Sequence, residues 1–537
     1  MTCGASPAPH RLMEMAGNRW LALGLAVALL ALFVIGRLPL YAGYWIPWYV
    51  PDSGRYFETA YAIAQGHLPR FSVRTPGYPL VLAAAITVTH RVSSIIVLQQ
   101  LATLLSGLSL YAAFVGARAW LAVPAAIAVA GFFATGDLVL YESYIGPESL
   151  YTSCLVGSVA ALVWGLRTRT ALPFITASLL MAFAILLRPA GLFLIVIVAV
   201  VVLAMWASAY PRTSVLAMAV PLPAVILALC AYNALTIHQF TISPFGSVNL
   251  MGATATFWTD SVRYPAPVRD AIQEVQRAIS EQDRETFATS WDPAKLYEAY
   301  NRYYNLALHV ALARRTSLDT GDPDTNRLFK AVAFDAIRRH PKAYAKFVYT
   351  SLCNFLYDAP LALYSFASFL DERYDQIYGT PPTAPINESG ALRAYMLQEF
   401  AMPRQPGLLI DATGKVQHNE ALRLHERISM HVFPAVFDAA TGLAALGMLV
   451  LATLVNLVLP ARRRASAAAI IASATVCLML IGAALVVALV ELGLQRYAAP
   501  TRFTYFLPLP LLAWIVVEWL RWPKDPVTRT APRSIRQ

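Results

Sequence analysis

The stretch that decides the fold class runs from Thr170 to Pro211 and reads TALPFITASLLMAFAILLRPAGLFLIVIVAVVVLAMWASAYP. Its only charged side chain is that of Arg188. An apolar helix of about 17–25 residues is long enough to cross the hydrocarbon core of a bilayer. The stretch therefore predicts two membrane-spanning helices, Thr170–Leu187 and Pro189–Pro211, joined by a very short turn.

The same apolar pattern recurs along the chain and predicts an all-α polytopic membrane protein. Further spans are expected at Trp20–Gly36, Val92–Ala117, Ala119–Gly136, Ser149–Leu166, Thr213–Leu235, Ala439–Ala461, Ala465–Val490 and Phe503–Leu520. Hydrophobic residues make up 58% and charged residues 14% of the chain, against about 45–50% and 25% in soluble domains. The segment Gly77–Thr89 is short for a crossing and is expected to be re-entrant or interfacial.

The charge distribution predicts the orientation of these spans. The net charge of +11 does not indicate nucleic acid as a partner, because the long polar segment 236–438 is near neutral and the excess lies beside the apolar runs. Positively charged loops stay in the cytoplasm. This predicts an integral protein of the plasma (inner) membrane, with a cytoplasmic N-terminus 1–19 and a cytoplasmic tail 521–537. A transmembrane module 20–235 with outer loops 38–91 and 137–148, an extracytoplasmic helical domain 236–438 and C-terminal transmembrane helices 439–520 are expected between them.

Acidic residues in the two outer loops are the first candidates for chemistry. Pro51-Asp52-Ser53-Gly54-Arg55-Tyr56 precedes a predicted surface helix. Asp52 is either a helix cap that pairs with Arg55 or a functional acid. Glu142 and Glu148 lie in the second outer loop, and Asp137, which directly ends a span, is a weaker candidate. Carboxylates at the membrane edge need a partner or a bound cation to offset their desolvation.

Arginines on the predicted outer side oppose the usual charge bias and therefore require an explanation. Arg74 precedes a proline-rich turn, Arg188 lies between two spans, and Arg496 precedes Tyr497 after the penultimate span. Their partners are either acidic side chains such as Glu142, Glu148 and Glu491 or a phosphate group, which arginine binds through two parallel hydrogen bonds. The sequence leaves these two interpretations open.

Together these groups match the needs of sugar transfer from a lipid phosphate at the membrane surface. The acceptor hydroxyl needs a general base, for which Asp52 is the candidate. The leaving phosphate needs preorganised positive charge, for which the candidates are Arg55, Arg74, Arg188 and Arg496. The lipid tail would lie against the apolar spans.

At these residues the sequence resembles the GT-C class of membrane glycosyltransferases, in particular the protein O-mannosyltransferases and the lipid A aminoarabinose transferases. The motifs are Asp52 with Arg55 and Tyr56, Arg74 before a proline-rich turn, the acidic loop with Glu142 and Glu148, the Leu187–Gly191 run, and Arg496-Tyr497. Three features depart from the family: Arg74-Thr75-Pro76 replaces a Lys-Pro-Pro element, the second loop offers Glu142 and Glu148 in place of the Asp-containing pairs of several members, and the Trp-Trp-Asp signature of oligosaccharyltransferases is absent.

The resemblance implies a GT-C-like bundle and an inverting transfer from a polyprenyl-phosphate sugar to an extracytoplasmic lipid, glycan or protein acceptor. It implies that Asp52 is the base and that Arg55, Tyr56 and Arg74 contact the donor phosphate. Some members hold a divalent metal with such acids, so that Mg²⁺ or Mn²⁺ at Asp52, Glu142 and Glu148 is an open expectation. The alternatives are a flippase or transporter of lipid-linked sugars, and a scaffold protein that would not require Asp52.

Overall fold

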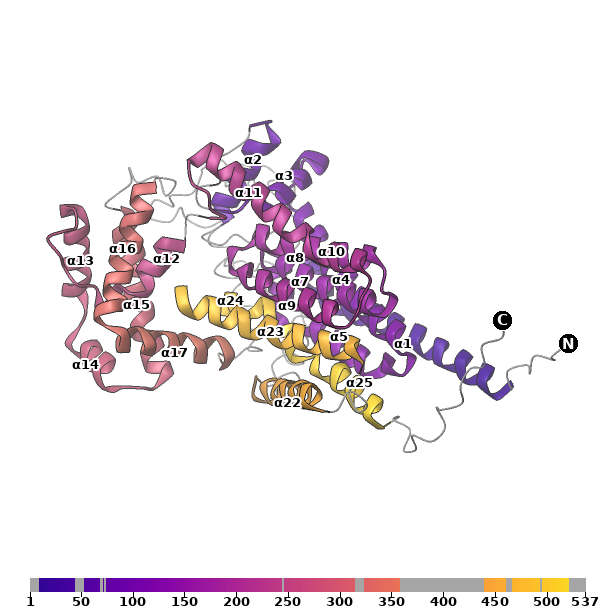
Figure 1. The fold of residues 1–537 in the computed structure, drawn as a ribbon. Helices are drawn as coiled ribbons and strands as arrows, with labels where there is room; N and C mark the ends of the chain where they lie inside the picture. Colours follow the sequence, from indigo (N-terminus) through magenta and orange to yellow (C-terminus); the bar gives the residue numbers. More distant parts are fainter. Residues whose placement is uncertain are drawn as a thin grey trace, which may run out of the picture.

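A computed structural model describes residues 9–43, 53–67, 71, 74–243, 246–313, 323–357, 439–459, 466–492 and 495–520. Within these residues the regular elements are all helices, arranged as a long bundle with a smaller helical domain at one end (Figure 1). In this described part of the chain, eight helices are long and apolar enough to cross a membrane. The predicted class, an all-α polytopic membrane protein, is therefore confirmed.

The bundle contains the helices of the predicted spans and further helices between them. The α-helices within the predicted spans are α1 (Pro9–Gly43), α4 (Ser94–Ala117), α5 (Ala122–Ala134), α7 (Glu148–Thr168), α8 (Ala171–Leu187), α9 (Phe193–Ala207), α10 (Arg212–Ala219), α11 (Pro221–Ile237), α22 (Ala439–Val458), α23 (Ala467–Val490) and α25 (Pro508–Leu520). The other α-helices of the bundle are α2 (Ser53–Ala64), α3 (Gly77–Thr89), α6 (Gly136–Glu142) and α24 (Gln495–Ala498), and its 3₁₀ helices are η1 (Ala119–Leu121), η2 (Pro189–Leu192) and η6 (Ala499–Tyr505).

Helix α7 forms the centre of the bundle, and α1 lies at its edge. In the candidate spans, 83% of the α7 residues are buried but only 17% of those in Arg19–Leu38 of α1. Large apolar side chains such as Trp20, Leu203 and Trp206 are exposed on the outside of the bundle. Such a surface is unfavourable in water and suits lipid, in which helices satisfy their own backbone hydrogen bonds.

Two regions differ in detail from the sequence predictions. The expected loop 137–148 begins as helix α6, which leaves only residues 143–147 between α6 and α7. The expected span Thr213–Leu235 consists of α10 and α11, separated at Val220 before Pro221. Proline lacks the amide hydrogen that would continue the helical hydrogen-bond ladder, and the two helices form one apolar span, Arg212–Ile237.

Helix α3 lies at one end of the bundle and packs closely against α8. A Cβ added to Gly77 would lie 2.6 Å from the backbone carbonyl of Leu186, so the first turn of α3 touches the last turn of α8. The chain then continues from α3 almost directly into α4, where Tyr78 meets Gln99 through a 3.3 Å hydrogen bond. The beginning of α3, the beginning of α4 and the end of α8 therefore share one end of the bundle, the site end.

The outer helical domain also lies toward the site end. It contains α12 (Gly246–Ala253), η3 (Ala255–Phe257), α13 (Ala266–Ala278), α14 (Glu281–Thr289), α15 (Pro293–Ala313), α16 (Pro323–Arg339) and α17 (Pro341–Tyr357). The domain docks on the last turn of α23: the Tyr344 hydroxyl donates to the Leu489 carbonyl (2.6 Å) and the Ser351 hydroxyl to the Glu491 carbonyl (2.7 Å). The amide of Asn249 in α12 hydrogen-bonds the Glu491 carboxylate.

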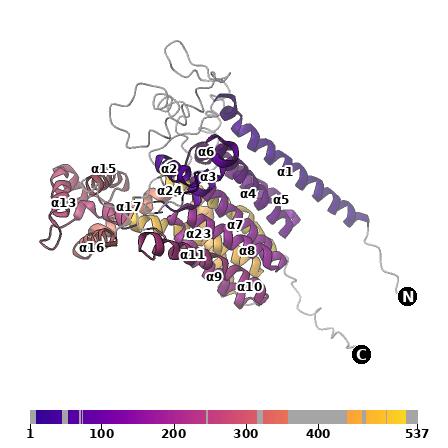
Figure 2. The same cartoon turned by 90° about the horizontal axis from the view of Figure 1, so that it is seen from above.

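At the opposite end of the bundle, Glu518 in α25 connects several segments of the chain. Its carboxylate accepts hydrogen bonds from the Trp514 indole (2.8 Å) and the Ser466 amide (2.5 Å) and pairs with Arg118 after α4 (3.4 Å). Seen from above, α4, α5, α7, α8 and α23 run side by side along the bundle (Figure 2). The last helix is thus bonded to segments from both halves of the chain.

Candidate active site

The segment Ser143–Pro147 is the point on which the site end converges. The side-chain amide of Gln99 donates to the carbonyls of Glu142 (2.8 Å) and Tyr144 (3.1 Å), which attaches the segment to α4. The hydroxyl of Ser53, the first residue of α2, donates to the carbonyl of Ile145 (2.7 Å). Every residue from 141 to 150 is buried. The first and second predicted outer loops therefore meet at this segment.

Glu148 follows this segment as the first residue of α7 and forms an ion pair with Arg188. The Arg188 Nη1 lies 3.0 Å from Oε1 of Glu148, and both side chains are almost fully buried. The guanidinium also lies over the Tyr497 ring, 4.8 Å from its centroid. Oε2 of Glu148 faces Gly146, where an added Cβ would lie 2.6 Å away. The acidic partner that the sequence offered for Arg188 is thus present.

A second group of side chains joins Arg74 to the same place. The Arg74 guanidinium lies 5.2 Å from the centroid of the Tyr56 ring, and this ring packs edge-on against Tyr78 with centroids 5.1 Å apart. Tyr78 donates to Gln99, whose amide in turn donates to the Tyr144 carbonyl in the segment before Glu148. Arg74 and Arg188 are therefore both connected to the segment Ser143–Pro147 and to Glu148, which follows it. We call Tyr56, Arg74, Tyr78, Glu148, Arg188 and Tyr497 the rim cluster.

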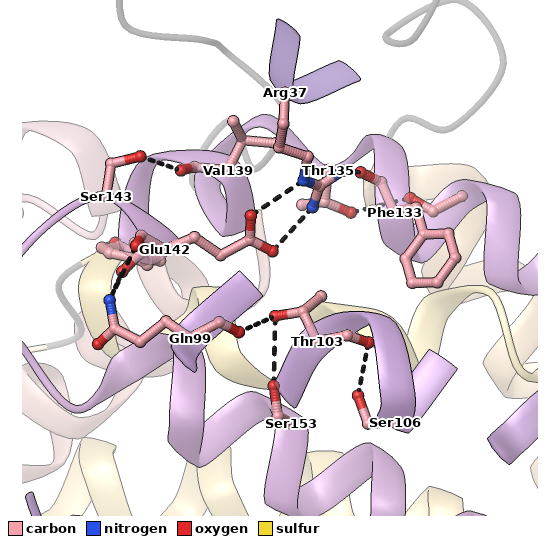
Figure 3. Close-up of polar contacts among 12 residues, drawn as sticks. Arg37, Gln99, Thr103, Ser106, Phe133, Thr135, Val139, Glu142, Ser143 and Ser153 are labelled. Atoms are coloured by element: carbon pink, nitrogen blue, oxygen red, sulfur yellow. Dashed lines mark hydrogen bonds and ion pairs between the residues drawn. The ribbon is translucent and has the colours of Figure 1, made fainter. Parts of the chain in front are cut away.

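Glu142 occupies a different position and forms a buried ion pair with Arg37 near the end of α1. Nε of Arg37 donates to Oε2 (3.0 Å) and Nη2 to Oε1 (2.8 Å), while Nη1 donates to the Phe133 carbonyl (2.7 Å). Figure 3 shows this two-point pairing beside the Gln99 amide. Both side chains are 0% exposed. Because Arg37 occupies both oxygens, Glu142 joins α1 to α6 and is separate from the rim cluster.

The remaining candidates are not placed in the rim cluster. Arg55 is exposed on the first turn of α2. Asp52 lies outside the described residues, as do the side chains of Asp137 and Arg496. Their immediate neighbours are described: Ser53 binds the Ile145 carbonyl, and Tyr497 lies against Arg188.

Of the expected metal site, the structure describes the side chains of Glu142 and Glu148, whereas Asp52 lies outside the described residues. No group of three or more His, Cys, Asp or Glu side chains with metal-binding geometry occurs among the described residues. Both oxygens of Glu142 accept from Arg37, and Oε1 of Glu148 accepts from Arg188. Divalent Mg²⁺ or Mn²⁺ requires several oxygen ligands on one ion, and an arginine-bound carboxylate does not fit this role.

Sequence reasoning missed three residues that shape the site. Arg37 directly ends the first apolar run, which is the same signal that singled out Arg188. Gln99 is an amide within an apolar span, and a buried amide needs hydrogen-bond partners. Tyr78 had no distinguishing pattern, because aromatic residues are common at both surfaces of a membrane.

The comparisons with known proteins find a distant structural likeness. The chain is similar to the oligosaccharyltransferase of Archaeoglobus fulgidus in the apo form, a GT-C glycosyltransferase, with a TM-score of 0.40 and 11% sequence identity. The match covers 92% of this chain and 50% of that chain, so this chain spans about half the length of that protein. No family model and no curated protein matches the sequence. A likeness this distant assigns no activity, and the functional argument rests on the site.

Proposed function

We propose that the protein is a membrane glycosyltransferase that moves a sugar from a polyprenyl-phosphate donor to an extracytoplasmic lipid, glycan or protein acceptor. The observation that carries the proposal is the rim cluster. It brings arginines from two distant parts of the chain, Arg74 and Arg188, to one end of the apolar bundle. A phosphate attached to a lipid tail would meet these cations at the membrane surface while its tail lies along the helices.

The proposed reaction needs one base and one leaving phosphate. Asp52 takes the proton of the acceptor hydroxyl, and the oxygen attacks the anomeric carbon of the donor sugar from the face opposite the phosphate. The bond between that carbon and the phosphate oxygen breaks, and the configuration at the carbon inverts. Polyprenyl phosphate leaves with the electron pair, and the proton remains on Asp52 until solvent accepts it. No step requires a metal ion.

The arginines have distinct roles in this scheme. Arg188 is held by Glu148 and Tyr497, so its charge is preorganised for the leaving phosphate and little reorganisation is needed during the reaction. Arg74 approaches from α3 and is oriented by the Tyr56 ring. Arg55 and Arg496 would contact the donor from the water side. The orientation with this end outside the plasma membrane belongs to the same proposal and follows the positive-inside rule.

The variant Asp52→Asn tests the proposed base. We expect transfer from radiolabelled polyprenyl-phosphate sugars to envelope extracts to fall by roughly 10²–10⁴-fold, the typical contribution of a general base, with unchanged donor binding. Asp270→Asn is the matched control, because Asp270 is exposed on α13. Transfer at the wild-type rate by the Asp52→Asn protein would remove the assigned base.

The variant Arg74→Ala tests the phosphate contact separately. We expect the dissociation constant of the donor to rise by about tenfold or more, the loss of one charge-assisted hydrogen bond. The matched control is Arg277→Ala in the outer domain, where Arg277 is bonded to Gln273 within α13. An unchanged donor titration in nanodiscs would contradict the assignment of Arg74.

A further inference from the structure

A polar cavity lies where α11 ends and the outer domain begins. Its volume is about 420 Å³. Its described lining residues are His238, Gln239, Phe240, Thr241, Ser243, Gly246, Ser247, Asn326, Arg327 and Lys330. Two of these carry a permanent positive charge, and none of them carries a carboxylate. The cavity is separate from the rim cluster, because none of its lining residues belongs to that cluster.

The cavity directly follows the end of an apolar span, at the site end of the bundle. Helix α11 completes the apolar span Arg212–Ile237, and the cavity lining begins at the next residue, His238. The Tyr232 ring, near the end of α11, packs against Phe71 with centroids 5.6 Å apart, which places this end of α11 beside the segment that leads to Arg74. Phe240, one of the lining residues, is 68% exposed, and Leu235 near the end of α11 is 81% exposed.

The wall of the cavity is built by buried polar side chains from three segments. The Ser247 hydroxyl donates to Oδ1 of Asn326, and Nδ2 of Asn326 donates to Oε1 of Gln239 (3.3 Å). Ser247 and Asn326 are 2% and 4% exposed. These bonds hold the beginning of α12, the beginning of α16 and the segment after α11 in one arrangement. The cavity is therefore a formed part of the fold.

The positive charges project from one face of α16. Arg327 and Lys330 are three residues apart, which places them on the same side of a helix. Arg327 pairs with Asp324 at 3.4 Å, but both side chains are more than 80% exposed. An ion pair in water contributes little and is easily exchanged. The guanidinium can therefore turn to a ligand in the cavity at small cost.

We propose that this cavity binds the phosphate-bearing headgroup of an anionic membrane lipid. Arginine and lysine at a membrane surface attract such headgroups and bind phosphate oxygens through charge-assisted hydrogen bonds. The exposed Leu235 and Phe240 provide an apolar path for the acyl chains beside α11. Free phosphate shares the charge but would not use the apolar path. The proposal stands independently of the glycosyl-transfer chemistry.

The charge is tested with the double variant Arg327→Ala/Lys330→Ala in nanodiscs of phosphatidylcholine that contain spin-labelled phosphatidic acid. We expect the association constant of the labelled lipid to fall by about tenfold or more, since charge-assisted contacts to phosphate are lost. The matched control is Arg338→Ala/Lys342→Ala, which removes two exposed positive charges outside the cavity. An equal loss in both double variants, or no loss in either, would overturn the proposal.

The volume is tested with Gly246→Trp, because a Cβ at Gly246 meets no atom within 4 Å and the side chain would fill the cavity. Gly447→Trp is the control at a similarly open position on α22. Only the first variant is expected to weaken binding of the labelled lipid.

Competition separates the two sources of phosphate: unlabelled phosphatidic acid should displace the label, and inorganic phosphate should not. Displacement by inorganic phosphate at similar concentration would overturn the lipid assignment.

Discussion

The Arg37–Glu142 pair shows how one buried contact divides residues that look alike in the sequence. Glu142 and Glu148 both lie at the membrane edge in the second outer loop. In the fold, Arg37 occupies both oxygens of Glu142, whereas Glu148 pairs with Arg188 in the rim cluster. The separation of these roles depends on Arg37 of α1, which bonds Glu142 at the end of α6. No local pattern in the sequence carries that information.

We expect Arg37→Met to lower the stability of the protein by about 3–5 kcal/mol, because removing one partner leaves a buried, unpaired charge. The double variant Arg37→Met/Glu142→Gln should recover most of this loss, since no buried charge remains. Thermal unfolding in detergent measures both effects. If glycosyl transfer is assayed, the double variant should keep it. A double variant as unstable as the single one would contradict a pairing role for Glu142.

At the residue scale, then, the sequence was sufficient to find the arginines but not to assign their partners. Arg74 and Arg188 were recognisable because charge near lipid is costly and needs a reason. Their convergence depends on tertiary contacts through Tyr56, Tyr78 and Gln99. Asp52 remains a prediction, tested by the variant described above.

Among the elements, the contact between α3 and α8 holds the two arginines of the rim cluster together. A Cβ at Gly77 would lie 2.6 Å from the Leu186 carbonyl and 2.7 Å from the Leu187 amide nitrogen, both backbone atoms. Arg74 lies three residues before Gly77, and Arg188 directly follows Leu187. The distance between the two cations is therefore set by a backbone-to-backbone contact that only glycine permits.

We expect Gly77→Ala to force α3 away from α8, because overpacking a close contact costs about 1–3 kcal/mol. The thermal midpoint and the donor affinity should both decrease. Gly24→Ala is the control, since a Cβ at Gly24 in α1 meets no atom within 4 Å. Equal midpoints for wild type and Gly77→Ala would show that the contact does not constrain α3.

Helix α14 of the outer domain supplies a pH-dependent element. Burial alone would raise the pKa of the Asp283 carboxyl. Hydrogen bonds from Tyr303, Ser280 and Arg302 have a larger, opposite effect, so the pKa lies below its usual value. The folded-state pKa is thus lower than the unfolded one, which is about 3.9. The resulting stabilisation is present above that value and is lost as the pH falls through the folded-state pKa.

We therefore expect the outer domain of the wild-type protein to lose stability below about pH 4. The Asp283→Asn variant should be less stable than the wild type at neutral pH, and its stability should fall less as the pH is lowered. Urea-unfolding midpoints of the full chain, followed by pulse-labelling hydrogen exchange in α13–α15, measure this. Asp270→Asn is the exposed control. A steeper acid loss in Asp283→Asn than in the wild type would refute the sign of the shift.

Elements and their types were largely predictable, because uncharged runs of sufficient length have few structures available in a membrane. Their breaks were less predictable. Pro221 separates α10 from α11 within the predicted span Thr213–Leu235, and Pro341 begins α17 directly after α16. Helix α6 was missed because its seven residues are too short to show a periodic pattern.

For the whole molecule, the contacts place the rim cluster, the cavity and the outer domain at one end of the bundle, and Arg118 and Glu518 at the other. The positive-inside rule predicts that the first end is extracytoplasmic.

In a cysteine-free protein, we expect Val262→Cys in the outer domain to react with a membrane-impermeant maleimide in right-side-out vesicles. Thr168→Cys at the other end should react only after permeabilisation. The reverse pattern would invert the proposed topology and place the site inside.

The position of the last described helix has a consequence for biogenesis. The Phe506 ring packs where a Cβ of Gly131 would lie, and Glu518 bonds Arg118 and Ser466. Helix α5 and the end of α4 thus complete their packing against a segment that the ribosome makes hundreds of residues later. The early spans must wait in the bilayer, only partly assembled, until that segment is inserted. A chain that ended before η6 would leave the contact surface on α5 and the end of α4 uncovered, and this surface would be accessible to the quality-control proteases of the membrane.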